Sequence, residues 1–287
     1  MIYKIFGLLL WVGSIMQASN PIHKKTLIDT LQKQPHPFEY ELDIKVIPSK
    51  NTNAPVMICA HGYGHSNCIA DVLNASRILH DYHLVSFNFP DYECLAKKYD
   101  YKKSSFGTID EILPLLYTLK RCIIDAGARI VHLYGFSAGG GALINLLAVL
   151  YGSSYDAQLQ KIGIEASKKQ QILKALQEGW IILDCPLKSM DEIVDLRGKD
   201  PELIFLAGQY KKNNMCPIDA IELLRGINVN IIIHFQKPDE ILGNRDDQLF
   251  IERVQKANHG KTEVIIGTEG GHNAYHASLW KWYARVK

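Results

Sequence analysis

The residues best suited to do chemistry lie in Gly135-Phe136-Ser137-Ala138-Gly139. This stretch follows the apolar run 128–134 and opens a segment that has the pattern of a helix, which predicts Ser137 on a sharp strand-to-helix turn. Glycines two residues before and after the serine suit such a turn, because its backbone is strained and a Cβ would clash with neighbouring strands. An ordinary tight turn can have the same pattern, so its meaning depends on partners elsewhere in the chain.

A second motif lies upstream, where residues 54–60 have the composition of a buried parallel strand. This run leads directly into His61-Gly62-Tyr63-Gly64-His65. Its position predicts a turn directly after this strand.

Two further strands are predicted late in the chain, at 228–235 and 262–267. The first ends in Gln236-Lys237-Pro238-Asp239-Glu240, and the second is followed by Gly270-Gly271-His272 and a closing helix. Asp239 and His272 therefore each follow one of these late strands.

The chain order Ser137, Asp239, His272 resembles that of the α/β-hydrolases, and it differs from the order in chymotrypsin-like and subtilisin-like enzymes. The resemblance covers nearly all of the chain after about residue 38. It implies that Ser137 is the nucleophile, His272 the general base and Asp239 the acid that orients it. It also implies an oxyanion hole made by the amide of Ala138 and one from the His-Gly loop, with Tyr63 the first choice and Gly62 the second.

The choice of acid stays open at this level. Glu240, Asp246 and Asp247 lie close to Asp239 in the sequence. Some α/β-hydrolases take the acid from the preceding strand, and Asp184 in Ile181-Ile182-Leu183-Asp184-Cys185-Pro186 is that rival. We expect Asp239 to be the acid.

The order of predicted elements favours an α/β fold with a mostly parallel twisted sheet, flanked by helices on both faces. Residues 38–46 alternate between apolar and polar, as in an edge strand with one wet face. Helices are predicted at 69–80 and 109–125, with a strand at 83–89 between them. Residues 157–178 are helix-forming, and 187–226 are expected to form a small helical lid above Ser137 or to pack as helices onto the sheet.

A length of 287 residues, 47% hydrophobic and 22% charged, suits one domain, expected over residues 20–287. The net charge of +2 indicates no nucleic-acid partner. Residues 1–19 have the pattern of a signal peptide, since Lys4 precedes an apolar run of roughly twelve positions, too short to span a bilayer. The protein is therefore expected to be periplasmic or secreted, with membrane contact only if this segment stays uncleaved as an anchor.

Of the six cysteines, Cys59, Cys122 and Cys185 fall at positions expected to be buried. Cys68, Cys94 and Cys216 lie in less regular stretches, where one disulfide stays open and no pairing can be deduced. The pairs His61/His65 and His272/His276 lack the glutamate of a zinc protease motif, so no metal site is expected.

These features predict a serine hydrolase that cleaves a carboxylic ester, or an amide, through an acyl-enzyme and without a cofactor. Its substrate would be a small ester or a short peptide. One alternative is a serine peptidase or aminopeptidase of the same fold. An alternative of another class is a non-catalytic binding protein or scaffold that kept the fold, because a fold alone does not determine function.

Overall fold

A computed structural model describes residues 24–32, 42–75, 79–90, 104–198, 200–224, 226–268 and 270–272. Within these residues the strands form one seven-stranded sheet, in the order β1-β3-β2-β4-β5-β6-β7. The strands are β1 (Ile44–Ile47), β2 (Val56–Ala60), β3 (His83–Phe87), β4 (Val131–Phe136), β5 (Trp180–Asp184), β6 (Asn230–Gln236) and β7 (Thr262–Gly267). All neighbouring pairs are parallel except β1 with β3, so the predicted mostly parallel sheet is confirmed. The edge strand predicted at 38–46 is observed at Ile44–Ile47, and residues 38–41 lie outside the described part of the chain.

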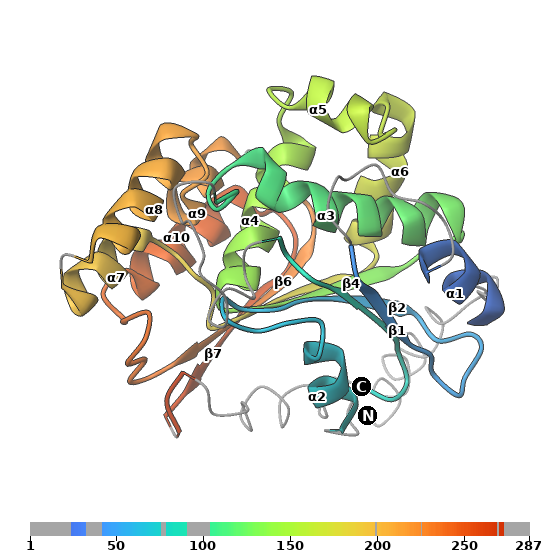
Figure 1. The fold of residues 1–287 in the computed structure, drawn as a ribbon, viewed down its shortest axis with the longest axis horizontal. Coiled ribbons are helices and arrows are strands. Elements are labelled where there is room, and N and C mark those ends of the chain that lie inside the picture. Colours follow the sequence, from blue (N-terminus) through green and yellow to red (C-terminus); the bar gives the residue numbers. More distant parts are fainter. Residues whose placement is uncertain are drawn as a thin grey trace, which may run out of the picture.

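Helices cover the sheet in two layers (Figure 1). One face carries α2 (Ile69–Ala75), whose Ala70 and Leu73 pack in a cluster with Met57, Leu84 and Ile182 of the sheet. The larger layer on the opposite face contains α1 (Lys24–Gln32), α3 (Ile109–Lys120), the π-helical turn η3 (Arg121–Asp125), α4 (Ala138–Tyr151), α5 (Asp156–Lys161), α6 (Ala166–Gln177), α7 (Met190–Arg197), α8 (Pro201–Lys212), α9 (Pro217–Ala220), the 3-10 turn η4 (Ile221–Leu223) and α10 (Asp247–Ala257).

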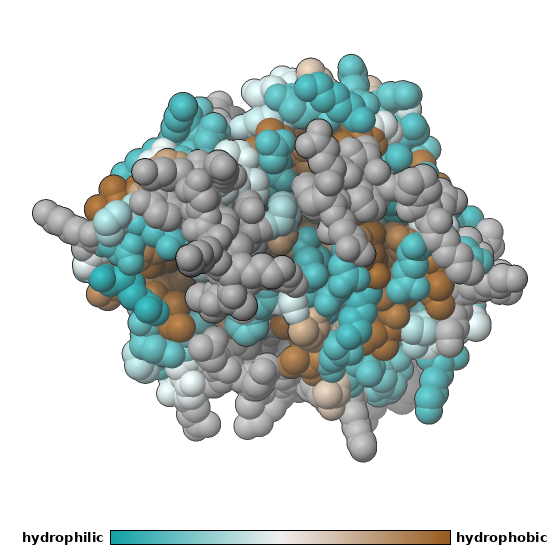
Figure 2. Space-filling view, in the orientation of Figure 1, coloured by the Kyte–Doolittle hydropathy of each residue, from teal (hydrophilic) through white to brown (hydrophobic). Residues whose placement is uncertain are grey.

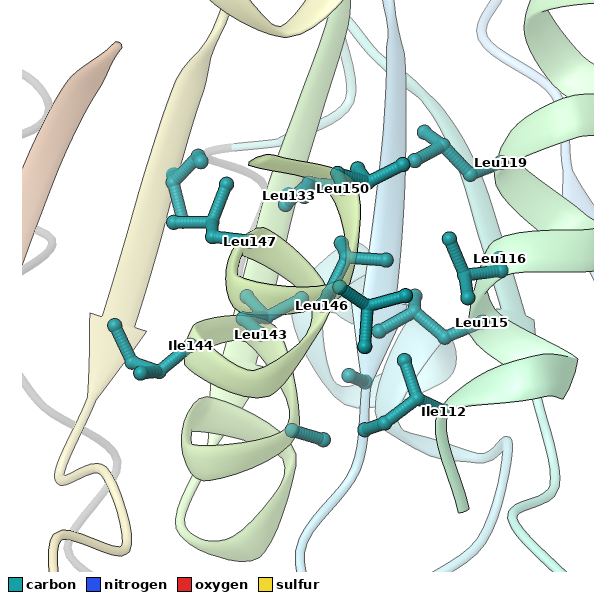
Figure 3. Close-up of a cluster of buried hydrophobic side chains, with 14 of the residues drawn as sticks. Ile112, Leu115, Leu116, Leu119, Leu133, Leu143, Ile144, Leu146, Leu147 and Leu150 are labelled. Carbon is teal, nitrogen blue, oxygen red and sulfur yellow. The ribbon is translucent and has the colours of Figure 1, made fainter. Parts of the chain in front are cut away.

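The main core holds α4, the helix that follows Ser137, against the sheet. Figure 3 shows leucines and isoleucines of α3 and α4 facing one another, with Leu133 of β4 beside Leu150. Residues 138–150 of α4 are all buried, which explains why all of them except Asn145 are glycine or apolar and the helix is not amphipathic. At about 1.5–3 kcal/mol for each large aliphatic side chain taken out of water, this packing fixes the helix whose first turn carries Ser137.

The observed elements follow the expected order with local differences. The helix expected at 109–125 consists of α3 followed by η3, and α2 is observed from Ile69 to Ala75. Segment 187–226 forms α7, α8, α9 and η4. The expected signal peptide and closing helix lie outside the described residues. In the described part of the chain, no helix combines the length and apolar character needed to span a bilayer.

The thiols of Cys59, Cys122, Cys185 and Cys216 are free and buried, and that of Cys68 is free and exposed. Cys94, the remaining candidate for a disulfide, lies outside the described residues. The surface in Figure 2 is largely hydrophilic over α5 and α6, and apolar patches occur in the region of α7 and α8. Leu196 of α7 and Ile204 of α8 are among the exposed large apolar side chains.

Candidate active site

Ser137 lies on the turn between β4 and α4, as its motif predicts. Its φ of 53° and ψ of −119° place a residue that is not glycine in a region of the backbone map that costs free energy. The turn is held from both sides, because the Ser137 amide donates to the Asp184 carbonyl at 2.9 Å and the Ser137 carbonyl accepts from the Leu187 amide at 2.8 Å. Backbone hydrogen bonds to the end of β5 and the residues after it therefore stabilise this strained conformation.

The glycines that flank the serine are required by close approach of the backbone. A Cβ on Gly135 would lie 2.7 Å from the carbonyl oxygen of Gly139. A Cβ on Gly139 would lie 2.3 Å from the carbonyl oxygen of Ala60, at the end of β2. Both distances are too short for any side chain, so α4 can begin this close to β2 and β4 only with glycine at these positions.

Three side chains from separate elements form one hydrogen-bonded chain. His272 Nε2 lies 3.0 Å from Ser137 Oγ, and His272 Nδ1 lies 2.8 Å from Asp239 Oδ2. Asp239 follows β6 and His272 follows β7, so all three residues come from the carboxyl ends of their strands. All three are buried. The structure therefore brings together the serine, acid and histidine that the sequence singled out.

The surroundings of Asp239 favour its charged form. Burial raises the pKa of this carboxyl group, but the hydrogen bond from His272, the charge of that ring when it is protonated and the amides of Leu242 and Ile241 outweigh burial, and the pKa is lowered. An ionised Asp239 can only accept hydrogen bonds. His272 must then carry its proton on Nδ1, which leaves the lone pair of Nε2 free to accept the hydrogen bond of the Ser137 hydroxyl.

Asp184, the rival acid, belongs to a different cluster. Its Oδ1 accepts from His234 Nδ1 at 2.8 Å and its Oδ2 accepts from the hydroxyl of Tyr134 at 2.5 Å. Asp184 stands opposite His234 in the register of β5 and β6. Burial, followed by the charge of Asp184, raises the pKa of Tyr134 well above its ordinary value, so that Tyr134 remains a donor. The structure therefore places Asp239 on His272 and Asp184 on a second, fully buried histidine.

Glu240 holds the main chain of His272, a role that its place in the sequence did not reveal. The amide of His272 donates to Oε2 and Oε1 of Glu240 at 3.0 and 3.2 Å. Gly271 has a φ of 68°, and a Cβ there would lie 2.6 Å from Glu240 Oε2. The two adjacent acids thus bind different parts of His272: Asp239 accepts from its ring, and Glu240 accepts from its backbone amide. The Gly-Gly pair before His272 was the available signal for this close packing.

The His-Gly loop lies beside the serine. A Cβ on Gly62 would be 3.1 Å from the Cβ of Ser137, while Ala138 begins α4 and so has no intrahelical acceptor for its amide. His61 shapes the turn, with Nδ1 donating to the Gly62 carbonyl at 2.9 Å and Nε2 accepting from the Phe89 amide at 3.1 Å. Burial lowers the pKa of His61 to about 4, which keeps this ring neutral.

Tyr63, the other residue considered for the oxyanion hole, turns its side chain toward α8. Its hydroxyl donates to Glu202 of α8 at 3.0 Å, and its ring meets that of Phe106 edge-on at 5.4 Å. Its backbone remains part of the turn that begins at Gly62, because the His65 amide closes that turn on the Gly62 carbonyl at 3.1 Å. Of the three candidates for the oxyanion hole, Gly62 and Ala138 therefore lie next to Ser137, and Tyr63 lies one residue further along the turn.

Two groups of described side chains have the donor types of a metal site, and they share Cys185. One contains Asp239 and His272, and the other contains Asp184 and His234. In each group the carboxylate and the imidazole are already bonded to each other at 2.8 Å, and burial raises the pKa of the Cys185 thiol. As the groups stand, their geometry is that of hydrogen-bonded pairs.

Comparison with known proteins shows which solved structures share this architecture. No family model matches the sequence, and no curated protein does. Among solved structures, a carboxylesterase of Lactobacillus plantarum superposes with a TM-score of 0.58 at 14% identity, over 83% of this chain and 82% of that one. An esterase of Pyrococcus furiosus gives 0.51 at 16% identity, over 86% and 88% of the two chains. Acetyl xylan esterase 1 of a Thermoanaerobacterium species gives 0.52 at 9%, over 93% and 95%.

At these identities the likeness concerns the fold. It extends over most of each chain, and the neighbours are esterases and lipase/esterase-like proteins. The strand order, the turn at Ser137 and these superpositions agree, and the chain has the α/β-hydrolase fold.

Proposed function

We propose that this protein is a serine hydrolase that cleaves carboxylic ester bonds through an acyl-enzyme intermediate. The observation that carries the proposal is the chain of hydrogen bonds from Asp239 through His272 to Ser137, at distances of 2.8 and 3.0 Å. A serine hydroxyl is a poor nucleophile by itself, and a base that is already in contact with it removes this obstacle.

In the proposed reaction, Ser137 Oγ attacks the carbonyl carbon of the ester while His272 Nε2 takes the hydroxyl proton. Asp239 stabilises the resulting imidazolium, because its carboxylate is ionised and hydrogen-bonded to Nδ1. As the tetrahedral intermediate collapses, the bond to the alcohol breaks and the alcohol takes that proton from His272. Water then attacks the acyl-enzyme by the same route, which releases the acid and restores Ser137.

The carbonyl oxygen becomes negatively charged in both tetrahedral intermediates, so the site needs donors there. We assign this role to the amide of Ala138 and to that of Tyr63, with Gly62 as the alternative to Tyr63. Ala138 also stands at the positive end of the dipole of α4, a helix of 14 residues. Removing one such donor typically costs about 3–4 kcal/mol of transition-state stabilisation.

Ester substrates are preferred over amides in this proposal because the solved structures that share the fold are esterases. Residues 187–226 are proposed as a lid, since α8 reaches the His-Gly loop through the contact of Glu202 with Tyr63. The exposed Leu196 and Ile204 on α7 and α8 give this segment an apolar surface for acyl chains. We also propose that residues 1–19 are a leader through which the protein is exported. No nucleic-acid partner is proposed.

The test is hydrolysis of p-nitrophenyl esters of increasing acyl length, together with aminoacyl amides, by wild type and Ser137→Ala. The substitution should reduce kcat by several orders of magnitude. Ser154→Ala, in the exposed turn between α4 and α5, serves as the control and should keep the wild-type rate. A fluorophosphonate should label wild type and the control but leave Ser137→Ala unlabelled.

Two results would contradict the proposal. Undiminished ester hydrolysis by folded Ser137→Ala would remove Ser137 from the mechanism. A folded wild type that neither hydrolyses any substrate of the panel nor reacts with the fluorophosphonate would favour a non-catalytic binding protein.

A further inference from the structure

A buried lysine lies between the loop that carries Asp239 and the segment that follows β5. The side chain of Lys188 is only 2% exposed, and its Nζ donates to the Gly243 carbonyl at 2.8 Å and to Asp247 Oδ1 at 2.5 Å. A second carboxylate, Glu192 Oε2, lies 3.6 Å away and is also buried. Lysine is rarely buried to this extent unless it is paired, so its contacts need an explanation.

From Lys188, hydrogen bonds lead to the backbone of Asp239 by two routes. On the first, Gly243, whose carbonyl accepts from Lys188, donates its amide to the Asp239 carbonyl at 3.1 Å. On the second, Asp247 Oδ2 accepts from Asn244 Nδ2 at 2.9 Å, and Asn244 Oδ1 accepts from the Asp239 amide at 2.9 Å. The carbonyl of Asp239 is therefore bonded directly to Gly243, a partner of Lys188, and the amide of Asp239 is connected through Asn244 to Asp247, another partner.

Glu192 holds the same loop one residue further along. Its Oε1 accepts from the amide of Arg245 at 2.6 Å and its Oε2 from that of Asp246 at 3.3 Å. Because Glu192 lies four residues after Lys188, on α7, the loop from 239 to 247 is attached to a short stretch of chain that follows β5.

That stretch also holds the turn of the nucleophile. The amide of Leu187, the residue before Lys188, donates to the Ser137 carbonyl at 2.8 Å, and the Lys188 carbonyl accepts from Ile218 at 3.0 Å. Adjacent residues thus contact the turn of Ser137 through the backbone and the loop of Asp239 through a side chain. Lys188 supplies the positive charge that binds the loop of Asp239 to this segment.

Stability alone is a weak reason for such a cluster. Removing charges from water is unfavourable, and apolar replacements of buried ion pairs are often neutral or stabilising. Geometry is a stronger reason, because a misplacement of about 1 Å in a catalytic group can lower the rate about 100-fold.

We propose that Lys188 is a positioning residue that keeps the loop of Asp239 at a set distance from the turn of Ser137. The inference rests on the proposed function, in which Asp239 must hold the ring of His272 while that ring reaches Ser137. Lys188 itself touches none of these three side chains in the contacts described above, so it acts through the two loops.

The decisive variant is Lys188→Met/Asp247→Asn. It removes the contacts of Lys188 with the loop of Asp239 and leaves those of Glu192 in place. It keeps an oxygen at position 247 for Asn244, and the cluster stays at its original net charge of −1, since Glu192 remains. The control is Lys169→Met/Asp156→Asn, which matches these contacts at a more exposed site, where the side chains are 14% and 50% exposed. Lys169 likewise donates to one carbonyl, Gly152, at 2.6 Å and to one carboxylate, Asp156, at 2.7 Å, and its contacts join α5 and α6.

Two measurements separate positioning from a general loss of structure. The first is ester kinetics, where the Lys188 double variant should lose about 10- to 100-fold in kcat while KM changes less than about twofold. The second is the proton NMR signal of His272 Nδ1–H, which a hydrogen bond to a carboxylate shifts far downfield. This signal should move or broaden in the Lys188 double variant and stay in place in the Lys169 control.

A folded Lys188 double variant with the wild-type kcat and an unchanged signal overturns the proposal, and so does an equal effect in the Lys169 control. If the double variant does not fold, the half-buried Asn244→Ala decides, because it cuts the second route and should shift the same signal. The signal needs no turnover. Absence of ester hydrolysis by wild type would therefore count against the proposed function, and the signal would still decide the role of Lys188.

Discussion

The substitution Asp239→Asn should prevent His272 from acting as a base. The two carboxylate oxygens have different partners: Oδ2 accepts from His272 Nδ1 at 2.8 Å, while Oδ1 accepts from the amides of Ile241 and Leu242 at 3.0 and 2.8 Å. An asparagine offers one oxygen that accepts and one NH2 group that only donates. One of the two sets of partners must therefore face the NH2 group.

The loop amides decide the orientation. If the oxygen of the substituted side chain turned toward His272, the amides of Ile241 and Leu242 would both lose their acceptor, at about 1–3 kcal/mol for each buried donor. The oxygen therefore stays with the loop and the NH2 group faces the ring. His272 Nδ1 must then accept, its proton moves to Nε2, and Nε2 can no longer take the proton of Ser137.

The expected result is a loss of about 10⁴-fold in kcat for a p-nitrophenyl ester, equivalent to about 5.5 kcal/mol, with little change in KM. Asp184→Asn is the control. Asp184 is also buried but is hydrogen-bonded to His234 and Tyr134, so this variant should keep kcat within about tenfold if it folds, as circular dichroism would show. A near-normal rate in Asp239→Asn combined with a large loss in Asp184→Asn would refute the reasoning and make Asp184 the acid.

Substitutions at three further positions test other contacts. Glu240→Ala should lower kcat about 5- to 10-fold, because a charged acceptor of the His272 amide is worth about 1–1.5 kcal/mol, and Glu240→Gln should recover most of the loss; equal rates in all three proteins would contradict this. Asn145→Leu should raise the free energy of unfolding in urea by about 1–3 kcal/mol, because among the described residues neither amide atom of this buried side chain has a hydrogen-bond partner; a lower value would reveal one. The third concerns pH. Burial lowers the pKa of His132 from 6.5 to about 4. The contribution of its neutral ring to the free energy of unfolding is therefore complete above pH 6.5, and about 3 kcal/mol of it is lost as the pH falls toward 4. His132→Asn, which keeps an acceptor for the Trp180 amide, should flatten the unfolding free energy over that pH range, and an unchanged slope would argue against a neutral His132.

Sequence reasoning succeeded where local properties decide. Each strand and helix depends on the pattern of its own residues, so the alternation of elements and the place of the turn could be predicted within a few residues. The glycines around Ser137 were also informative, because the close approach that requires them occurs wherever a helix begins this near its strand. The exact ends were less predictable: the expected helix 109–125 became α3 and η3, since helix ends depend on what packs against them.

The sequence by itself determined the order of the elements and placed Ser137, Asp239 and His272 each after a strand. Only the tertiary structure decided which carboxylate meets which imidazole, because that depends on contacts between residues far apart in the chain. Asp184 and His234 face each other through the register of β5 and β6, and this left Asp239 for His272. The same holds for two other contacts, the hydrogen bond of the His272 amide to Glu240 and the burial of Lys188 between two carboxylates. Both form only when the loops fold against one another, and no local sequence pattern predicts such distances.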